Sequence, residues 1–263
     1  MKYKMIVSDF DGTLAYKGQI PQPTVDAIKR YIASGGIFIV CTGRAPQSIK
    51  DKIGALGIST VVSTHQGSLI VNIETDEVLQ SGGLDYETAS KIVEQVRKDA
   101  AAIAIIGDEL IYEIPNRYSD VFINRALKVE SIAEELKRRK QLVNRIVVST
   151  VDEKVPKLIE KYSQAFKGKA IANSGASYIV EIISPSFTKK QSVEFLADYY
   201  GIPYNEIMAV GDSTNDIPLI DGKWHGVAIG NAHEQLKKVA NEITVPFEEH
   251  PVKYLIEKYC LER

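Results

Sequence analysis

The sequence predicts an α/β protein with a parallel sheet and a second, inserted α+β domain. Short apolar runs alternate with helical patterns at both ends of the chain, whereas the apolar runs of the middle lie in pairs around turns. The 263 residues are 44% apolar, enough for one large domain or two smaller ones with buried cores. We expect a core of residues 1–81 and 187–263 and an inserted domain of residues 82–186.

The elements expected in the core are strands, seen as unbroken apolar runs, and helices, seen as apolar residues every three or four positions. Strands are expected at residues 5–7, 37–41, 60–63, 206–210 and 226–229, and helices at residues 23–33, 46–56, 191–200 and 252–259. Their alternation along the chain favours parallel βαβ units.

The elements expected in the middle of the chain are hairpins, because pairs of apolar runs flank short turns. The paired runs are residues 102–106 with 110–114, and residues 170–173 with 178–183; a further strand is expected at 145–149 and a helix at 153–165. Residues 81–83 and 184–186 contain serine, glycine and proline and are expected to be the hinges.

The composition excludes several classes of protein. The 32 basic and 34 acidic residues give a net charge of −2, which does not favour a nucleic-acid or anionic-membrane partner. Cys41 and Cys260 form no CxxC pair, so neither a disulfide scaffold nor a zinc knuckle is expected. With no signal peptide and no apolar run of about 20 residues, we expect a soluble, cytoplasmic protein.

The stretch Asp9-Phe10-Asp11-Gly12-Thr13 follows the first strand directly. Side chains two positions apart share a face of a strand, so both carboxylates can face one site, and each raises the other's pKa. Ligands bind at this carboxyl edge of open α/β sheets. The alternatives are a pair of solvated acids or a helix N-cap.

Two further stretches could bind an anion. Cys41-Thr42-Gly43-Arg44 follows the second strand, and its hydroxyl and backbone N–H groups suit a phosphate, although a plain capping turn fits equally well. Lys189 and Lys190 open a helix, where a positive charge opposes the helix dipole and hints at a nearby anion. Taken alone, each lysine is better explained as a solvated side chain than as an anion ligand.

The stretch from Gly211 to Asp216 follows another apolar strand and carries two carboxylates and an amide. Oxygen ligands of this kind suit Mg²⁺. A calcium loop is the rival metal site, but the EF-hand spacing is absent, and a polar surface turn is the simplest alternative. Together the four stretches supply acids for a metal, a lysine and a hydroxyl for a phosphate, and a spare carboxylate for nucleophilic attack.

The four stretches resemble the motifs of the haloacid dehalogenase superfamily of phosphohydrolases, in the order typical of the Cof-type subfamily with its type IIB cap. The matching residues are Asp9-Phe10-Asp11-Gly12-Thr13 (DxDGT), Thr42-Gly43-Arg44 (TGR), Lys189, and Gly211-Asp212 with Asn215-Asp216 (GDxxND). Lys190 stands where the family usually has glycine, and Gln66-Gly67 replaces the commoner Asn-Gly. The resemblance implies a Rossmann-like core and an inserted α/β cap.

The resemblance also implies an Mg²⁺-dependent phosphatase that forms an aspartyl-phosphate. Asp9 would be the nucleophile and Asp11 the general acid and base, with their pKa values pushed apart by proximity. The metal ligands would be Asp9, the backbone carbonyl of Asp11, and Asp212. The phosphate would be bound by Phe10, Thr42, Gly43, Arg44, Lys189 and Asn215, with Thr13 and Asp216 in supporting roles.

Two alternatives to the phosphatase stay open: a phosphomutase of the same superfamily, and a non-catalytic protein that binds a phosphometabolite. A P-loop enzyme is not expected, because no GxxxxGK[ST] occurs. Sugar phosphates, flavin mononucleotide and pyridoxal phosphate are the small substrates that the resemblance suggests, and the sequence does not choose among them or between monomer and homodimer. Arg117 and Tyr118 are candidate selecting residues in the cap.

Overall fold

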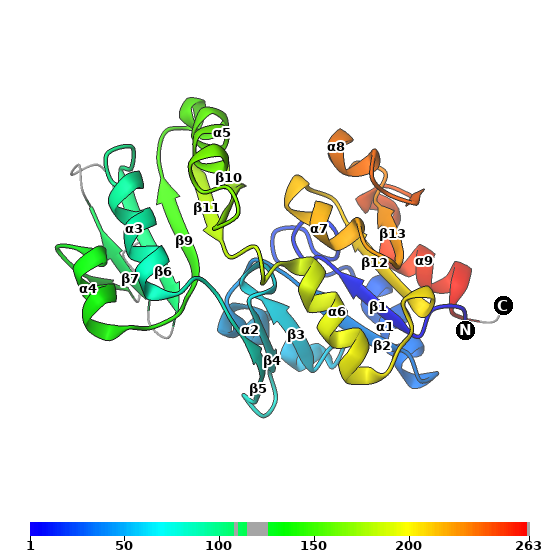
Figure 1. The fold of residues 1–263 in the computed structure, drawn as a ribbon. Helices are drawn as coiled ribbons and strands as arrows, with labels where there is room; N and C mark the ends of the chain where they lie inside the picture. The colour runs from blue at the N-terminus through cyan, green and yellow to red at the C-terminus, as the bar shows by residue number, and fades with distance from the viewer. Residues whose placement is uncertain (108–109, 115–125, 262–263) are drawn as a thin grey trace. The chain divides into compact units, whose positions relative to one another are not determined.

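The computed structural model describes residues 1–107, 110–114 and 126–261, which form two compact units (Figure 1). The first unit contains Met1–Ser81 and Thr188–Arg263, and the second contains Gly82–Phe187. Each unit has its own sheet and its own apolar core. No helix in the described part of the chain is long and apolar enough to cross a membrane.

The first unit is built on a sheet in the order β14-β13-β12-β1-β2-β3-β4-β5. Neighbouring strands are parallel from β14 to β3, as the sequence predicts, and antiparallel from β3 to β5. The strands are β1 (Met5–Ser8), β2 (Ile37–Cys41), β3 (Val61–Thr64), β4 (Leu69–Asn72), β5 (Val78–Ser81), β12 (Ile207–Gly211), β13 (His225–Ala228) and β14 (Glu242–Ile243).

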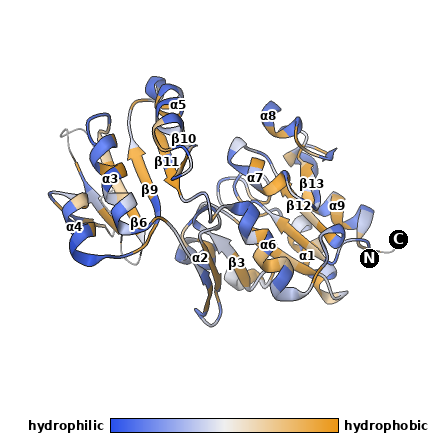
Figure 2. Ribbon diagram, in the orientation of Figure 1, coloured by the Kyte–Doolittle hydropathy of each residue, from blue (hydrophilic) through white to orange (hydrophobic). Residues whose placement is uncertain are grey.

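Helices pack around this sheet and contain both hydrophilic and hydrophobic residues, while strands such as β12 are largely hydrophobic (Figure 2). The helices are α1 (Gln22–Ala33), α2 (Pro46–Ile53), α6 (Lys189–Tyr200), α7 (Ile217–Ile220), α8 (Glu234–Lys237) and α9 (Pro251–Tyr259), and the 3₁₀ turns are η1 (Gly54–Leu56), η2 (His65–Gly67), η4 (Tyr204–Glu206), η5 (Thr214–Asp216) and η6 (Phe247–Glu249). A capping box between Thr188 and Gln191 begins α6, and Gly201 in the left-handed region ends it.

The second unit has a sheet in the order β10-β11-β9-β6-β7-β8, with both predicted hairpins, β6–β7 and β10–β11, confirmed. Helices α3 and α4 have no counterpart among the sequence-based predictions, although Asp85 and Ser131 cap their first turns. The elements are β6 (Ala102–Gly107), β7 (Leu110–Glu113), β8 (Leu127–Lys128), β9 (Val143–Ser149), β10 (Ile171–Ala176), β11 (Ile179–Ile183), α3 (Tyr86–Val96), α4 (Ile132–Arg139), η3 (Asp152–Lys154) and α5 (Val155–Ala165).

Candidate active site

The first and fourth motifs meet at the carboxyl edge of the parallel sheet, because the strands that precede them, β1 and β12, are neighbours. The backbone N–H of Asp9 donates to the carbonyl of Val210 at 2.9 Å, which extends the pairing by one residue. Thr13 donates its hydroxyl to Asp212 Oδ1 at 2.7 Å. Gly12 has φ +89°, and a Cβ there would lie 2.5 Å from Asp212 Oδ2, so the turn requires glycine.

Lys189 joins the third motif to the other two. Its Nζ donates to Asp9 Oδ1 at 2.5 Å and to Asp216 Oδ1 at 2.6 Å, and the residue is only 1% exposed. The neighbouring Lys190 lies apart from the carboxylates, because its Nζ donates to the carbonyl of Asp221 at 2.9 Å. Of the two lysines that open α6, Lys189 therefore has the contacts of a site residue.

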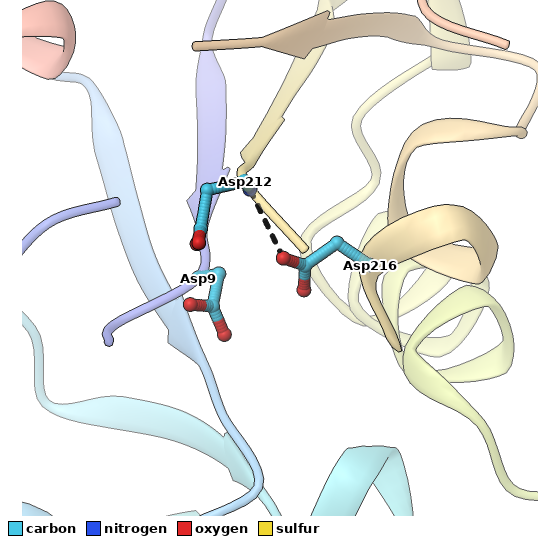
Figure 3. Close-up of side chains that lie close together, drawn as sticks. All are labelled: Asp9, Asp212 and Asp216. Atoms are coloured by element: carbon cyan, nitrogen blue, oxygen red, sulfur yellow. Dashed lines mark hydrogen bonds between the residues drawn. The ribbon is translucent and has the colours of Figure 1, made fainter. Parts of the chain in front are cut away.

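Asp216 uses both carboxylate oxygens to shape the loop of the fourth motif. Oδ1 accepts from Lys189, while Oδ2 accepts from the backbone N–H groups of Asp212 and Ser213, each at 3.1 Å. Figure 3 shows the bond to Asp212. A Cβ on Gly211 would lie 2.7 Å from Asp216 Cβ, so the side chain packs directly on the strand end. These contacts fit the supporting role that the sequence suggests for Asp216.

The three carboxylates crowd one another and face a single lysine. One oxygen from each of Asp9, Asp212 and Asp216 lies within 4.8 Å of the others (Figure 3). Burial, reinforced by Asp216, raises the pKa of Asp9 well above its ordinary value, and the same two causes raise the pKa of Asp212 to about 6. Burial disfavours the charged form of Lys189, but Asp216 and Asp9 outweigh it and raise the lysine's pKa.

This cluster has the chemistry of a site for a hard divalent cation. The available donors are carboxylate oxygens, with no sulfur or imidazole in the cluster described. Since both oxygens of Asp216 are engaged in hydrogen bonds, Asp9 and Asp212 are the carboxylates best placed to hold a cation. A bound cation would favour the charged carboxylates and so lower the raised pKa values of Asp9 and Asp212.

Asp11 lies in a different environment from Asp9. Its side chain is 49% exposed and accepts two bonds from Arg44, Nε to Oδ2 and Nη2 to Oδ1, both at 2.7 Å. Strand β1 ends at Ser8, so the alternation of a strand does not reach Asp11. The sequence predicts that Asp11 raises the pKa of Asp9. In the structure the main causes of the raised pKa are instead burial and the charge of Asp216.

The remaining predicted phosphate ligands lie in varied positions. Phe10 is fully buried, and the Arg44 guanidinium lies 5.3 Å from the Phe10 ring centroid while paired with Asp11. Thr42 is buried, and its Oγ1 accepts a hydrogen bond from the backbone N–H of Arg44, two residues along, at 3.1 Å. Asn215 Oδ1 is buried without a hydrogen-bond partner among the described residues.

The turn at residues 65–67 is a part of the site whose role the sequence does not reveal. Gln66 lies in the left-handed region, with φ 62°. Gly67 has φ +101°, and a Cβ there would lie 2.2 Å from the carbonyl oxygen of Thr188. The turn therefore supports the first residues of α6, directly beside Lys189. The predicted cap residues Arg117 and Tyr118 lie outside the described residues.

Residues 6–256 match the model of the haloacid dehalogenase-like hydrolases. The chain belongs to this family. The resemblance inferred from the four motifs is thereby confirmed, and the fold is the family's.

Among curated members of the family, a Haemophilus influenzae protein provisionally named a phosphatase is 27% identical over 267 residues, covering 98% of both chains. A 5-amino-6-(5-phospho-D-ribitylamino)uracil phosphatase of Bacillus subtilis is 25% identical over 297 residues, covering 97% of both. Among solved structures, a subclass IIB sugar phosphatase has a TM-score of 0.81 at 21% identity, covering 97% of this chain and 98% of that one.

Proposed function

We propose that this hydrolase is an Mg²⁺-dependent phosphatase of small phosphomonoesters and that it works through an aspartyl-phosphate on Asp9. The observation that carries the proposal is the position of Asp9. It is buried at the carboxyl edge of the sheet, 2.5 Å from the Lys189 cation and within the carboxylate cluster. The names of its curated relatives support the same reaction class.

The residues that would hold Mg²⁺ are Asp9, Asp212 and the backbone carbonyl of Asp11. When bound, the cation would neutralise charge on the phosphate oxygens and reduce their repulsion of the attacking carboxylate. Thr13 keeps Asp212 oriented through its 2.7 Å bond. Lys189 remains a cation at neutral pH and supplies a second positive charge beside Asp9.

In the first step, Asp9 attacks the phosphorus atom. Lys189 holds Oδ1, so Oδ2 is the oxygen that forms the new bond. The bond between phosphorus and the leaving-group oxygen breaks, and Asp11 donates a proton to that oxygen. Before this step Asp11 must leave its ion pair with Arg44 and take up a proton from solvent, and the phosphate is the anion that can take its place on the guanidinium.

In the second step, Asp11 takes a proton from water, whose oxygen attacks phosphorus, releases inorganic phosphate and restores Asp9. The phosphate would be held by Thr42, the backbone of Phe10 and Gly43, Lys189 and Asn215. The substrates suggested by the family, which are sugar phosphates, flavin mononucleotide and pyridoxal phosphate, each present a phosphomonoester to these groups.

The test is phosphate release from these substrates, with Mg²⁺ and with EDTA. We expect Mg²⁺-dependent release by the wild type and by Asp26→Asn, an exposed control aspartate on α1 whose Oδ1 accepts from Gln22. Asp9→Asn should release no phosphate while keeping the fold, measured by circular dichroism. Activity of Asp9→Asn equal to that of the wild type, or full activity in EDTA, would contradict the proposal.

A further inference from the structure

The segment of residues 11–19, which we call the motif loop, folds back on itself directly after Asp9. Asp11 forms a β-bridge with Ala15, and the Gly12 N–H donates to the Ala15 carbonyl at 2.8 Å. Bridged residues lie about 5 Å apart and consecutive Cα atoms about 3.8 Å apart, so the Tyr16 Cα lies within about 9 Å of the Asp11 Cα. Tyr16 therefore lies on the same short loop as the proposed general acid, one residue beyond the bridge.

Tyr16 presents its ring to solvent beside a second aromatic residue. It is 61% exposed, and its ring centroid lies 6.0 Å from that of Phe247 at an angle of 44° between planes. The Lys17 ammonium lies 5.4 Å from the Tyr16 centroid, a cation–π distance. Phe247 is half-buried and packs against the core, so the exposed ring of the pair is that of Tyr16, which offers a stacking surface to a ligand.

Phe247 is tied to the loop of the fourth motif. Its backbone N–H is held by Asn231 Oδ1 at 3.0 Å, and the Gly230 N–H donates to the Val245 carbonyl at 3.0 Å. Two residues beyond Asn231, the His233 N–H donates to the Asp212 carbonyl at 2.7 Å. The loops that carry Asp11 and Asp212 thus each position one ring of the pair.

We propose that Tyr16 and Phe247 form an aromatic platform, in which Phe247 packs at 44° against Tyr16 and the Tyr16 ring stacks on a planar ring in the leaving group, which makes ring-bearing phosphomonoesters the preferred substrate class. This inference rests on the proposed phosphatase function and narrows it. A heteroaromatic ring offers a flat π-face to the exposed Tyr16 ring, whereas a saturated sugar does not. Both rings of the platform belong to the first unit.

The test compares Tyr16→Leu, which removes the ring but keeps an apolar side chain, with Tyr16→Phe, which keeps the ring. Tyr199→Leu is the matched control, because Tyr199 is a 53% exposed tyrosine of α6 that also contacts another aromatic ring. Values of kcat/KM are measured with Mg²⁺ for pyridoxal phosphate and flavin mononucleotide, which carry rings, and for glucose 6-phosphate, which carries none.

We expect Tyr16→Leu to lower kcat/KM for the ring-bearing substrates about tenfold, mainly through KM, and to change glucose 6-phosphate less than about twofold. Tyr16→Phe and Tyr199→Leu should behave like the wild type. Equal losses for both classes would show that Tyr16 only positions the motif loop, and no loss for either would show that the ring is unused. Either result overturns the proposal.

A second readout does not depend on turnover. The fluorescence of riboflavin, the product of flavin mononucleotide hydrolysis, should be quenched when riboflavin binds to the wild type. Riboflavin should bind about tenfold more weakly to Tyr16→Leu. Unchanged binding, or no binding to the wild type, would refute the platform. Failure of the phosphatase proposal has a separate signature, the absence of Mg²⁺-dependent phosphate release from every substrate by the wild type.

Discussion

Replacing Asp212 by asparagine should make the metal-free protein more stable at neutral pH while removing its response to Mg²⁺. Burial and Asp216 raise the pKa of Asp212 to about 6, so at about pH 7.5 its carboxylate is ionised in an environment that disfavours the charge. Asparagine has nearly the same shape, and its Oδ1 can still accept the bond from Thr13. The substitution thus removes a charge and keeps the local contact.

The size of the effect follows from the difference between the pKa of about 6 and the ordinary 3.8. At 1.36 kcal/mol per pKa unit this difference gives about 3 kcal/mol as an upper value. Between about pH 4 and pH 6 the folded wild type binds a proton that the unfolded chain has lost, so its stability falls as the pH rises. Above about pH 6 the folded wild type bears the full free-energy cost of the charged Asp212, whereas the Asp212→Asn variant has no charge at this position.

The assay is thermal unfolding in EDTA from about pH 4.5 to pH 7.5, for the wild type, Asp212→Asn and the control Asp26→Asn. A domain of this size changes its Tm by about 2–4 °C for each kcal/mol. Because a protein with two compact units need not unfold in a single transition, the transition to follow is the one that Mg²⁺ shifts. Mg²⁺ at 100 times its Kd should stabilise the wild type by about 2.7 kcal/mol.

The reasoning would be refuted by an Asp212→Asn variant that is less stable than the wild type in EDTA at about pH 7.5. It would also be refuted if the wild type and the variant lost stability equally between about pH 4.5 and pH 7.5. A variant that Mg²⁺ stabilises as strongly as the wild type would remove Asp212 from the metal ligands.

Two further predictions concern the surroundings of Asp9. Lys189→Met should lower the free energy of unfolding in urea by about 3–5 kcal/mol, because it leaves two buried carboxylates without their cation. Lys190→Met should lower it by less than about 0.5 kcal/mol. Equal losses of stability would contradict the assignment of Lys189 as the lysine of the site. Gly67→Ala should lower the free energy of unfolding by more than about 2 kcal/mol and slow phosphate release, because its Cβ would meet the Thr188 carbonyl. Gly57 also has a positive φ, +61°, but lies in open space, so Gly57→Ala should cost about 1 kcal/mol of stability and leave phosphate release unchanged.

The parallel sheet was predictable because buried strands such as β2 (Ile37–Cys41) are unbroken apolar runs, whose residues match the expected range. Helix α4 escaped prediction because only Ile132, Ala133 and Leu136 of its eight residues are buried. Its signals were local instead: the Ser131 cap, acids in the first turn and bases in the last.

The sequence places the four motifs directly after strands or at the start of a helix, as the structure has them, but does not give their side-chain partners. The pairing of Arg44 with Asp11 spans 33 residues, and that of Lys189 with Asp9 spans 180. Such contacts depend on which strands become neighbours, which no local pattern encodes. The identity of Asp216 as a fully buried acceptor likewise follows only from the packing of its loop on Gly211.

The central position of β1 has a consequence for how the protein is made. One neighbour of β1 is β2, but the other is β12, which begins at Ile207. At about 5–20 residues per second, the ribosome needs roughly 10–40 s to deliver it. Throughout that interval the strand that leads to Asp9 has an unpaired edge, while the residues from Gly82 to Phe187 can already fold as a unit. The nascent chain is therefore most exposed to aggregation, and most in need of a chaperone, before its last quarter emerges.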